Sequence, residues 1–149
     1  MRVVLGSDHA GYEMKQKVLA RVQSLGHQVL DVGTDDASPA DYPDYAEALA
    51  MAILNRQADR GIMICGSGVG ASVATNKIPG IRACVCHDCY SARQGVEHDD
   101  MNVLVLGARV IGIELAYDLV KVFLEARFSS EERHLRRIAK VKQLESKFR

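Results

Sequence analysis

The stretch ICGSGVGAS, residues 64–72, joins an apolar run to a loop with glycine at every second position. Gly66, Gly68 and Gly70 permit a tight turn whose backbone N–H groups can face an anion. Cys65 stands directly before the first glycine, where the start of a following helix would favour the thiolate. The loop therefore predicts an anion site with a reactive sulfur at its edge.

Three kinds of chemistry use such a loop. A dinucleotide site wants G-x-G-x-x-G after the first strand and an acidic residue about 20 positions later, whereas this loop has G-x-G-x-G after the third apolar run. A cysteine phosphatase needs an arginine six positions after the cysteine to hold phosphate, and that position is Ala71. In the third chemistry Cys65 is a base and the loop amides hold an oxyanion formed during proton transfer, which nothing in the loop contradicts.

A second stretch, ACVCHDCY, holds three cysteines and a histidine. On a strand, Cys84 and Cys86 would face one side and His87 the other, and no second cysteine pair completes a four-ligand zinc site. Cys86 and Cys89 have the spacing of a dithiol redox motif, but in thioredoxin-like chains that motif follows an early strand, whereas here it follows the fourth. We expect Cys84 and Cys86 to be core or helix-packing thiols and Asp88 to start the next helix.

Composition limits the setting in which this chemistry operates. The chain has 149 residues, of which 48% are hydrophobic, which suits one domain over residues 1–149. Lys plus Arg and Asp plus Glu number 19 each, so no global charge attracts nucleic acid or an anionic membrane. The opening MRVVLGSDHAG has neither a basic leader nor a long apolar run, so we expect no signal peptide or membrane span, a cytoplasmic location and reduced thiols.

The elements that position these residues alternate along the chain. Short apolar runs rich in β-branched residues predict five strands, at 3–5, 29–32, 61–65, 83–86 and 103–106. Amphipathic stretches between them predict helices. The sequence therefore predicts an α/β fold, a three-layer α/β/α sandwich with a five-stranded parallel sheet. A last helix is expected from about residue 130, where Ser129 and Glu132 have the spacing of a capping box.

In open parallel sheets ligands bind beyond the carboxyl ends of the strands. Polar residues follow each predicted strand here, and we expect them to converge on one rim. They are Ser7, Asp8 and His9 after the first strand, Asp41 and Tyr42 after the second, the glycine loop after the third, His87 after the fourth and Arg109 after the fifth.

Five ordered blocks of the sequence, GSDHAGYEMK, DYPDYA, GIMICGSGVGASVATNKIPGIRA, EHDDMNVLVLGARVIGIELA and RHLRRI, together resemble the type B ribose-5-phosphate isomerases. These enzymes form a group with galactose-6-phosphate isomerase subunits. The resemblance implies a Rossmann-like sandwich of strand order 2-1-3-5-4 and an enzyme of the pentose phosphate pathway that acts on a phosphorylated sugar. It also implies a homodimer with shared active sites, which sequence does not separate from a tetramer, and neither metal nor organic cofactor.

The resemblance also implies roles for single residues. Aldose–ketose exchange removes a proton next to a carbonyl and leaves an enediolate, and Cys65 resembles the family's base. One branch of the family has glutamate at the position of Ala71, so alanine leaves Cys65 as the candidate. The other implied site residues are Ser67 and the amides of Gly66, Gly68 and Gly70 for the enediolate, His98 for ring opening, Asp8 and Tyr42 for the sugar, and Arg133, Arg137, His9 and Arg109 for the phosphate, with His134 as a weaker candidate.

One position departs from the family pattern. Where five-carbon isomerases usually have asparagine after the histidine, this chain has Asp99, which can only accept a hydrogen bond when ionised. We expect ribose 5-phosphate to be the substrate, with a four- or six-carbon aldose phosphate as the alternative. A dithiol oxidoreductase and a non-catalytic phosphosugar-binding subunit are the remaining hypotheses.

Overall fold

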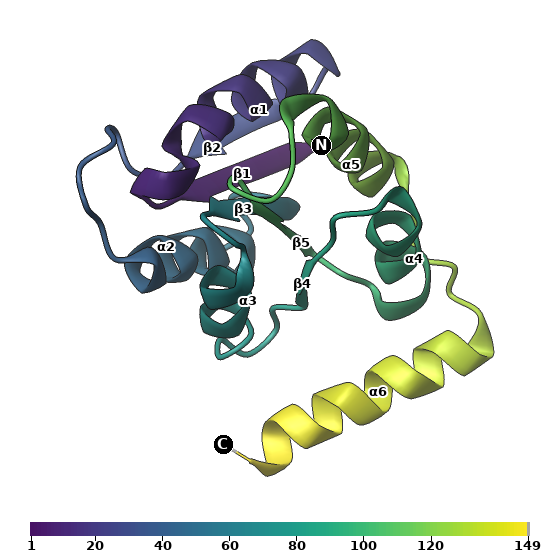
Figure 1. The fold of residues 1–149 in the computed structure, drawn as a ribbon. Coiled ribbons are helices and arrows are strands. Elements are labelled where there is room, and N and C mark those ends of the chain that lie inside the picture. Colours follow the sequence, from purple (N-terminus) through teal and green to yellow (C-terminus); the bar gives the residue numbers. More distant parts are fainter. Residues whose placement is uncertain (149) are drawn as a thin grey trace.

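The computed structural model describes residues 1–148 and contains a five-stranded sheet in the order β2-β1-β3-β5-β4 (Figure 1). All neighbouring strands are parallel, as the apolar runs predicted. The strands are β1 (Arg2–Ser7), β2 (Gln28–Asp31), β3 (Arg60–Cys65), β4 (Ala83–Val85) and β5 (Val103–Gly107). The fold class and the strand order implied by the resemblance are therefore confirmed.

Helices cover both faces of the sheet, so the three-layer sandwich is confirmed. One face packs against α1 (Tyr12–Ser24), α4 (Cys89–Asp99) and α5 (Ile113–Glu125), and the other against α2 (Tyr42–Leu54) and α3 (Val69–Thr75). A single 3-10 turn, η1 (His9–Gly11), precedes α1. Each face has its own cluster of buried side chains, because alternate residues of the central strands point to opposite faces.

The strand register aligns the residues that follow the central strands. Cys65 at the end of β3 pairs with Gly107 of β5, and Ser7 at the end of β1 pairs with Ile64. The chain segments that leave β1, β3 and β5 therefore start side by side at one edge of the sheet.

The last helix, α6 (Glu132–Lys147), lies at the edge of the molecule, below α4 and β4 in Figure 1. It buries only His134 and Ile138. The predicted capping box is wrong: Glu131 is the N-cap residue and no side chain caps it, because the Ser129 hydroxyl pairs instead with Nδ1 of His134, 2.6 Å away. Within residues 1–148, no helix has both the length and the apolar character needed to cross a bilayer.

Candidate active site

Cys65 lies at the carboxyl end of β3 with 5% of its surface exposed. The backbone N–H of Gly68 donates to its sulfur at 3.2 Å. Gly68 has φ +86 and packs against the Leu106 carbonyl carbon, 3.3 Å from where a Cβ would stand, so a side chain there would be strained. The thiolate is the form of cysteine that acts as a base, and the Gly68 N–H is a hydrogen-bond donor within its reach.

The glycine loop folds tightly against its neighbours. A Cβ at Gly107 would lie 2.5 Å from the Ser67 carbonyl oxygen, and a Cβ at Gly70 would lie 2.8 Å from the Tyr42 ring. Tyr42 thus covers the loop from the start of α2. Ser67 is exposed, and its hydroxyl accepts the Val69 N–H at 3.2 Å. The N–H of Gly68, one of the three glycine amides expected to hold the enediolate, therefore already has an acceptor, and so does the N–H of Val69.

Asp8 and His9 follow β1 and stand beside this loop. Asp8 is 7% exposed and caps η1, accepting the Gly11 N–H at 3.1 Å, so one of its two oxygens is already used. The Ala40 N–H donates to Nδ1 of His9 at 3.1 Å, which places the proton of the neutral ring on Nε2. His9 can therefore offer an N–H to an anion.

Arg109 follows β5 and lies over the same loop. Its backbone N–H donates to the Gly66 carbonyl at 2.9 Å, and its Nη1 lies 3.4 Å from the place of a Cβ on Gly66. The side chain is exposed, so its charge faces the solvent-filled space in front of the loop. The structure thus brings together Asp8, His9, Tyr42, Cys65, the loop and Arg109.

The other predicted site residues lie elsewhere. His98 and Asp99 are the last residues of α4, which starts after the carboxyl end of β4 and runs back toward the amino ends of the strands. Asn102 follows them and bonds to the backbones of Gly61 and Arg82, at the starts of β3 and β4. An eleven-residue helix spans about 16 Å. His98 and Asp99 are therefore at the opposite end of the sheet from Cys65.

Arg133 and Arg137 belong to this second group, because α6 packs against α4 through His134. The His134 ring stacks on the His98 ring with 4.2 Å between centroids. Both arginine side chains are exposed, and Arg133 pairs with Glu131 at 2.9 Å. A phosphate would have to compete with that carboxylate for Arg133. One chain thus carries two separate half-sites. The Cys65 half-site consists of Asp8, His9, Tyr42, Cys65, the glycine loop and Arg109. The His98 half-site consists of His98, Asp99, Arg133 and Arg137.

Two histidine contacts were not predicted from sequence. His87 accepts the Gly107 N–H through Nε2 at 3.0 Å, which fixes the ring to the end of β5. His134 is 1% exposed, and burial, followed by its neighbour His98, lowers its pKa. No local sequence pattern predicts that His98 and His134, 36 positions apart, lie against each other. The only signal is that His134 stands between Arg133 and Arg137 in the sequence.

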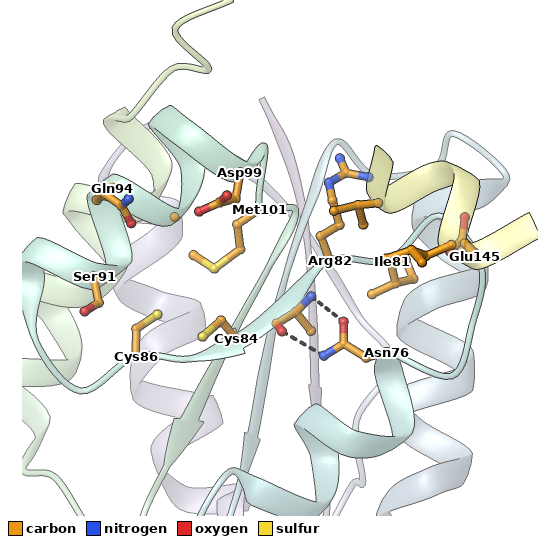
Figure 2. Close-up of a pocket in the computed structure, with 14 residues that line it drawn as sticks. Asn76, Ile81, Arg82, Cys84, Cys86, Ser91, Gln94, Asp99, Met101 and Glu145 are labelled. Carbon is orange, nitrogen blue, oxygen red and sulfur yellow. Dashed lines mark hydrogen bonds between the residues drawn. The ribbon is translucent and has the colours of Figure 1, made fainter. Parts of the chain in front are cut away.

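The cysteine-rich stretch lines a groove of about 650 Å³ along the edge strand β4 (Figure 2). Gln94 and Asp99 of α4 stand on one side, and Asn76 and Glu145 on the other. The expectation that both Cys84 and Cys86 are packing thiols is half wrong. Cys86 is buried, but Cys84 is exposed because β4 lies at the edge of the sheet.

Cys86 is a poor candidate for dithiol chemistry. Burial above all, with the neighbouring Cys84 next, raises the pKa of Cys86 to about 12, so it remains a thiol at neutral pH. Asp88 caps α4 by accepting the Ser91 N–H at 2.7 Å, as predicted.

Comparison with known proteins agrees with this architecture. Residues 3–141 match the model of a family described as Ribose/Galactose Isomerase. Ribose-5-phosphate isomerase B of Escherichia coli is 40% identical over 98% of this chain and 97% of its own. The solved ribose-5-phosphate isomerase B of Clostridium thermocellum is 44% identical with a TM-score of 0.97, and each chain is covered completely.

A solved neighbour also shows the class of ligand. Ribose-5-phosphate isomerase B from Mycoplasma genitalium, with bound ribulose 5-phosphate, is 33% identical with a TM-score of 0.91 over 97% of this chain and 96% of its own. Sequence and structure comparisons therefore agree over nearly the whole chain. The chain therefore belongs to the ribose/galactose isomerase family.

Proposed function

We propose that this isomerase interconverts ribose 5-phosphate and ribulose 5-phosphate through an enediolate, with Cys65 as the base. The observation that carries the proposal is the Cys65 sulfur, which accepts the Gly68 N–H at the mouth of a glycine loop. The names of the relatives and the ribulose 5-phosphate bound to the Mycoplasma enzyme support the choice of sugar.

The geometry of the Cys65 half-site suits proton transfer next to a carbonyl. The thiolate takes the proton from C2 of the open-chain aldose, and the electrons move into an enediolate. Loop amides still free to donate, with the Ser67 hydroxyl, would hold its oxygens. A second proton passes from O2 to O1, next to the Ser67 hydroxyl, and the first proton returns to C1 to give the ketose. None of these steps requires a metal ion or an organic cofactor.

Charge around the loop supports binding of an anionic substrate. Arg109 lies over the loop, His9 has an Nε2–H to offer from the end of β1, and Asp8 keeps one carboxylate oxygen for sugar hydroxyls. The protein is proposed to work in the cytoplasm, where its four free cysteines stay reduced.

A second copy of the chain is proposed to complete the site. His98, which would promote ring opening, and Arg133 and Arg137, which would hold the phosphate, lie about a helix length from Cys65 of their own chain. In a two-fold dimer each copy offers both half-sites, so two complete sites form. A tetramer would be a pair of such dimers.

The test is a direct assay of kcat/KM on ribose 5-phosphate, erythrose 4-phosphate, allose 6-phosphate and unphosphorylated ribose, with and without chelator. We expect ribose 5-phosphate to react best, ribose to react poorly and the chelator to have no effect. Equal rates on ribose and ribose 5-phosphate would refute the phosphate contacts. No turnover of any sugar phosphate by folded protein would favour a non-catalytic binding subunit.

Asp99 supports a six-carbon or four-carbon aldose phosphate as the alternative substrate. Its carboxylate is exposed and lines the groove beside His98, where an amide would be able to donate a hydrogen bond. If Asp99 sets specificity, Asp99→Asn shifts the ratio of kcat/KM values toward ribose 5-phosphate in the same assay. Ratios that stay within about twofold, roughly 0.4 kcal/mol, would show that Asp99 does not choose the sugar.

A further inference from the structure

The ring of His98 is held from two sides by its own chain. Gln94, one helical turn earlier on α4, places its side-chain Nε2 2.9 Å from Nδ1 of His98. His134 of α6 stacks on the ring with 26° between the planes. These contacts leave Nε2 as the nitrogen of His98 that can meet a ligand.

The atom of Gln94 that faces the His98 ring is its amide nitrogen, and this determines which ring nitrogen of His98 carries the proton. An amide nitrogen carries two hydrogens and no available lone pair, so it can only donate. Nδ1 of His98 must therefore accept, and the neutral ring carries its proton on Nε2. His134 cannot alter this assignment through its own nitrogens, because its Nδ1 is paired with the Ser129 hydroxyl and its Nε2 has no partner among the described residues.

We propose that Gln94 is a positioning residue that fixes His98 in the Nε2–H tautomer, so that His98 acts as a neutral hydrogen-bond donor to the substrate. The inference rests on the proposed function, in which His98 of one copy promotes ring opening at the Cys65 half-site of the other. Gln94 itself touches His98 and need not touch the sugar.

This tautomer assigns a definite task to His98 in ring opening. The bond between C1 and the ring oxygen breaks, and C1 becomes a carbonyl as the anomeric hydroxyl gives its proton to water. The ring oxygen takes a proton from water, so the net proton count is unchanged. Throughout, the Nε2–H of His98 stabilises the negative charge that develops on the ring oxygen, as a preorganised donor does.

The tautomer is tested first without any reliance on activity. Long-range 1H–15N correlation spectra of the full-length protein, labelled on histidine nitrogen, distinguish a protonated from an unprotonated ring nitrogen, and His98→Asn assigns the signal. We expect Nδ1 of His98 to be unprotonated in the wild type. In Gln94→Glu the carboxylate can only accept, so the proton moves to Nδ1. Protonated Nδ1 in the wild type, or an unchanged spectrum in Gln94→Glu, overturns the proposal.

A kinetic split tests the consequence. Ribulose 5-phosphate has its C5 oxygen phosphorylated and cannot close a furanose on C2, so the reaction from ketose to aldose needs no ring opening. We expect Gln94→Glu to slow initial rates from ribose 5-phosphate by about tenfold to a hundredfold and rates from ribulose 5-phosphate by less than about twofold. At high concentrations of Gln94→Glu, the rate from ribose 5-phosphate should stop rising with added enzyme, because spontaneous ring opening of the sugar in solution then limits that rate.

The matched control is Gln23→Glu, which adds the same charge at an exposed position of α1 and should leave both directions unchanged. Equal losses in both directions for Gln94→Glu would indicate a merely structural role and overturn the inference. A wild type that fails in both directions would instead refute the proposed function, while the spectra would still decide the tautomer.

Discussion

At the scale of single residues, the proposed chemistry depends on the thiol of Cys65. Replacing it with alanine removes the base but leaves the loop and the arginines, so Cys65→Ala should lower kcat by at least about a hundredfold. KM should change only severalfold, because the base acts in the transition state rather than in ground-state binding. Steady-state kinetics on ribose 5-phosphate, with ligand binding followed by calorimetry, measure both quantities.

The other thiols supply the matched controls for that experiment. Cys86→Ser and Cys89→Ser should keep most of the wild-type turnover, since both residues lie outside the Cys65 half-site. A folded Cys65→Ala variant with nearly normal kcat would rule out Cys65 as the base. Loss of turnover in folded Cys86→Ser would reopen the dithiol hypothesis.

Residue types and spacing were enough to single out part of this site. The glycines after Cys65 permit the tight turn that brings the Gly68 N–H to the sulfur. The stacking of His98 on His134 could not be predicted, because no periodic pattern links two residues that are 36 positions apart on different helices. The Asp8 cap, by contrast, was open to prediction, because capping a first turn is a common role for an aspartate that follows a strand.

At the scale of elements, the contact between α6 and α4 should make stability depend on pH. The folded state lowers the pKa of His134 from 6.5, chiefly by burial and then by His98 and Arg133, with Arg137 acting in the same direction and Glu131 against it. Below pH 6.5 the unfolded chain therefore binds more protons at this site than the folded one, so stability falls as pH drops from about 7 to 5. Thermal melting across that range measures the slope.

A second histidine, His27, also contributes to the pH dependence of stability and must be distinguished from His134. His27, beside the N-terminal amine, also has a lowered pKa, because of burial and then that positive charge. His134→Gln and His27→Gln should each reduce the change in melting temperature between about pH 7 and pH 5. Only His134→Gln acts through the contact between α6 and α4. Melting temperatures that do not vary with pH in the wild type, or a slope that His134→Gln leaves unchanged, would contradict the argument.

Elements differ in how far sequence predicts them. β1, β3 and β5 are buried on both faces, and their continuous apolar runs identify them directly. The exposure of Cys84 was missed although the implied strand order already placed β4 at the edge of the sheet, because an apolar run alone does not show which of its residues a helix covers. The start of α6 was misplaced by two residues because Ser129, which suits a cap, is engaged by His134.

At the scale of the whole molecule, the direction of the strands separates the two half-sites. Parallel strands put the Cys65 group at their carboxyl ends, and the return path through α4 puts His98 at their amino ends. The exposed arginines of α6 lie with His98. Neither group contains both a base and a pair of phosphate-binding arginines, so an active isomerase requires the Cys65 group of one copy to face the His98 group of another.

Subunit complementation tests this claim most directly. Cys65→Ala and the double variant Arg133→Ala with Arg137→Ala should each be nearly inactive alone, because each damages every site. After equal amounts are unfolded together and refolded, half of the dimers are mixed and each mixed dimer has one intact site, so isomerase activity should recover to about a quarter of the refolded wild type. A mixture that stays as inactive as its parents, while refolded wild type recovers, would contradict a site shared between two copies.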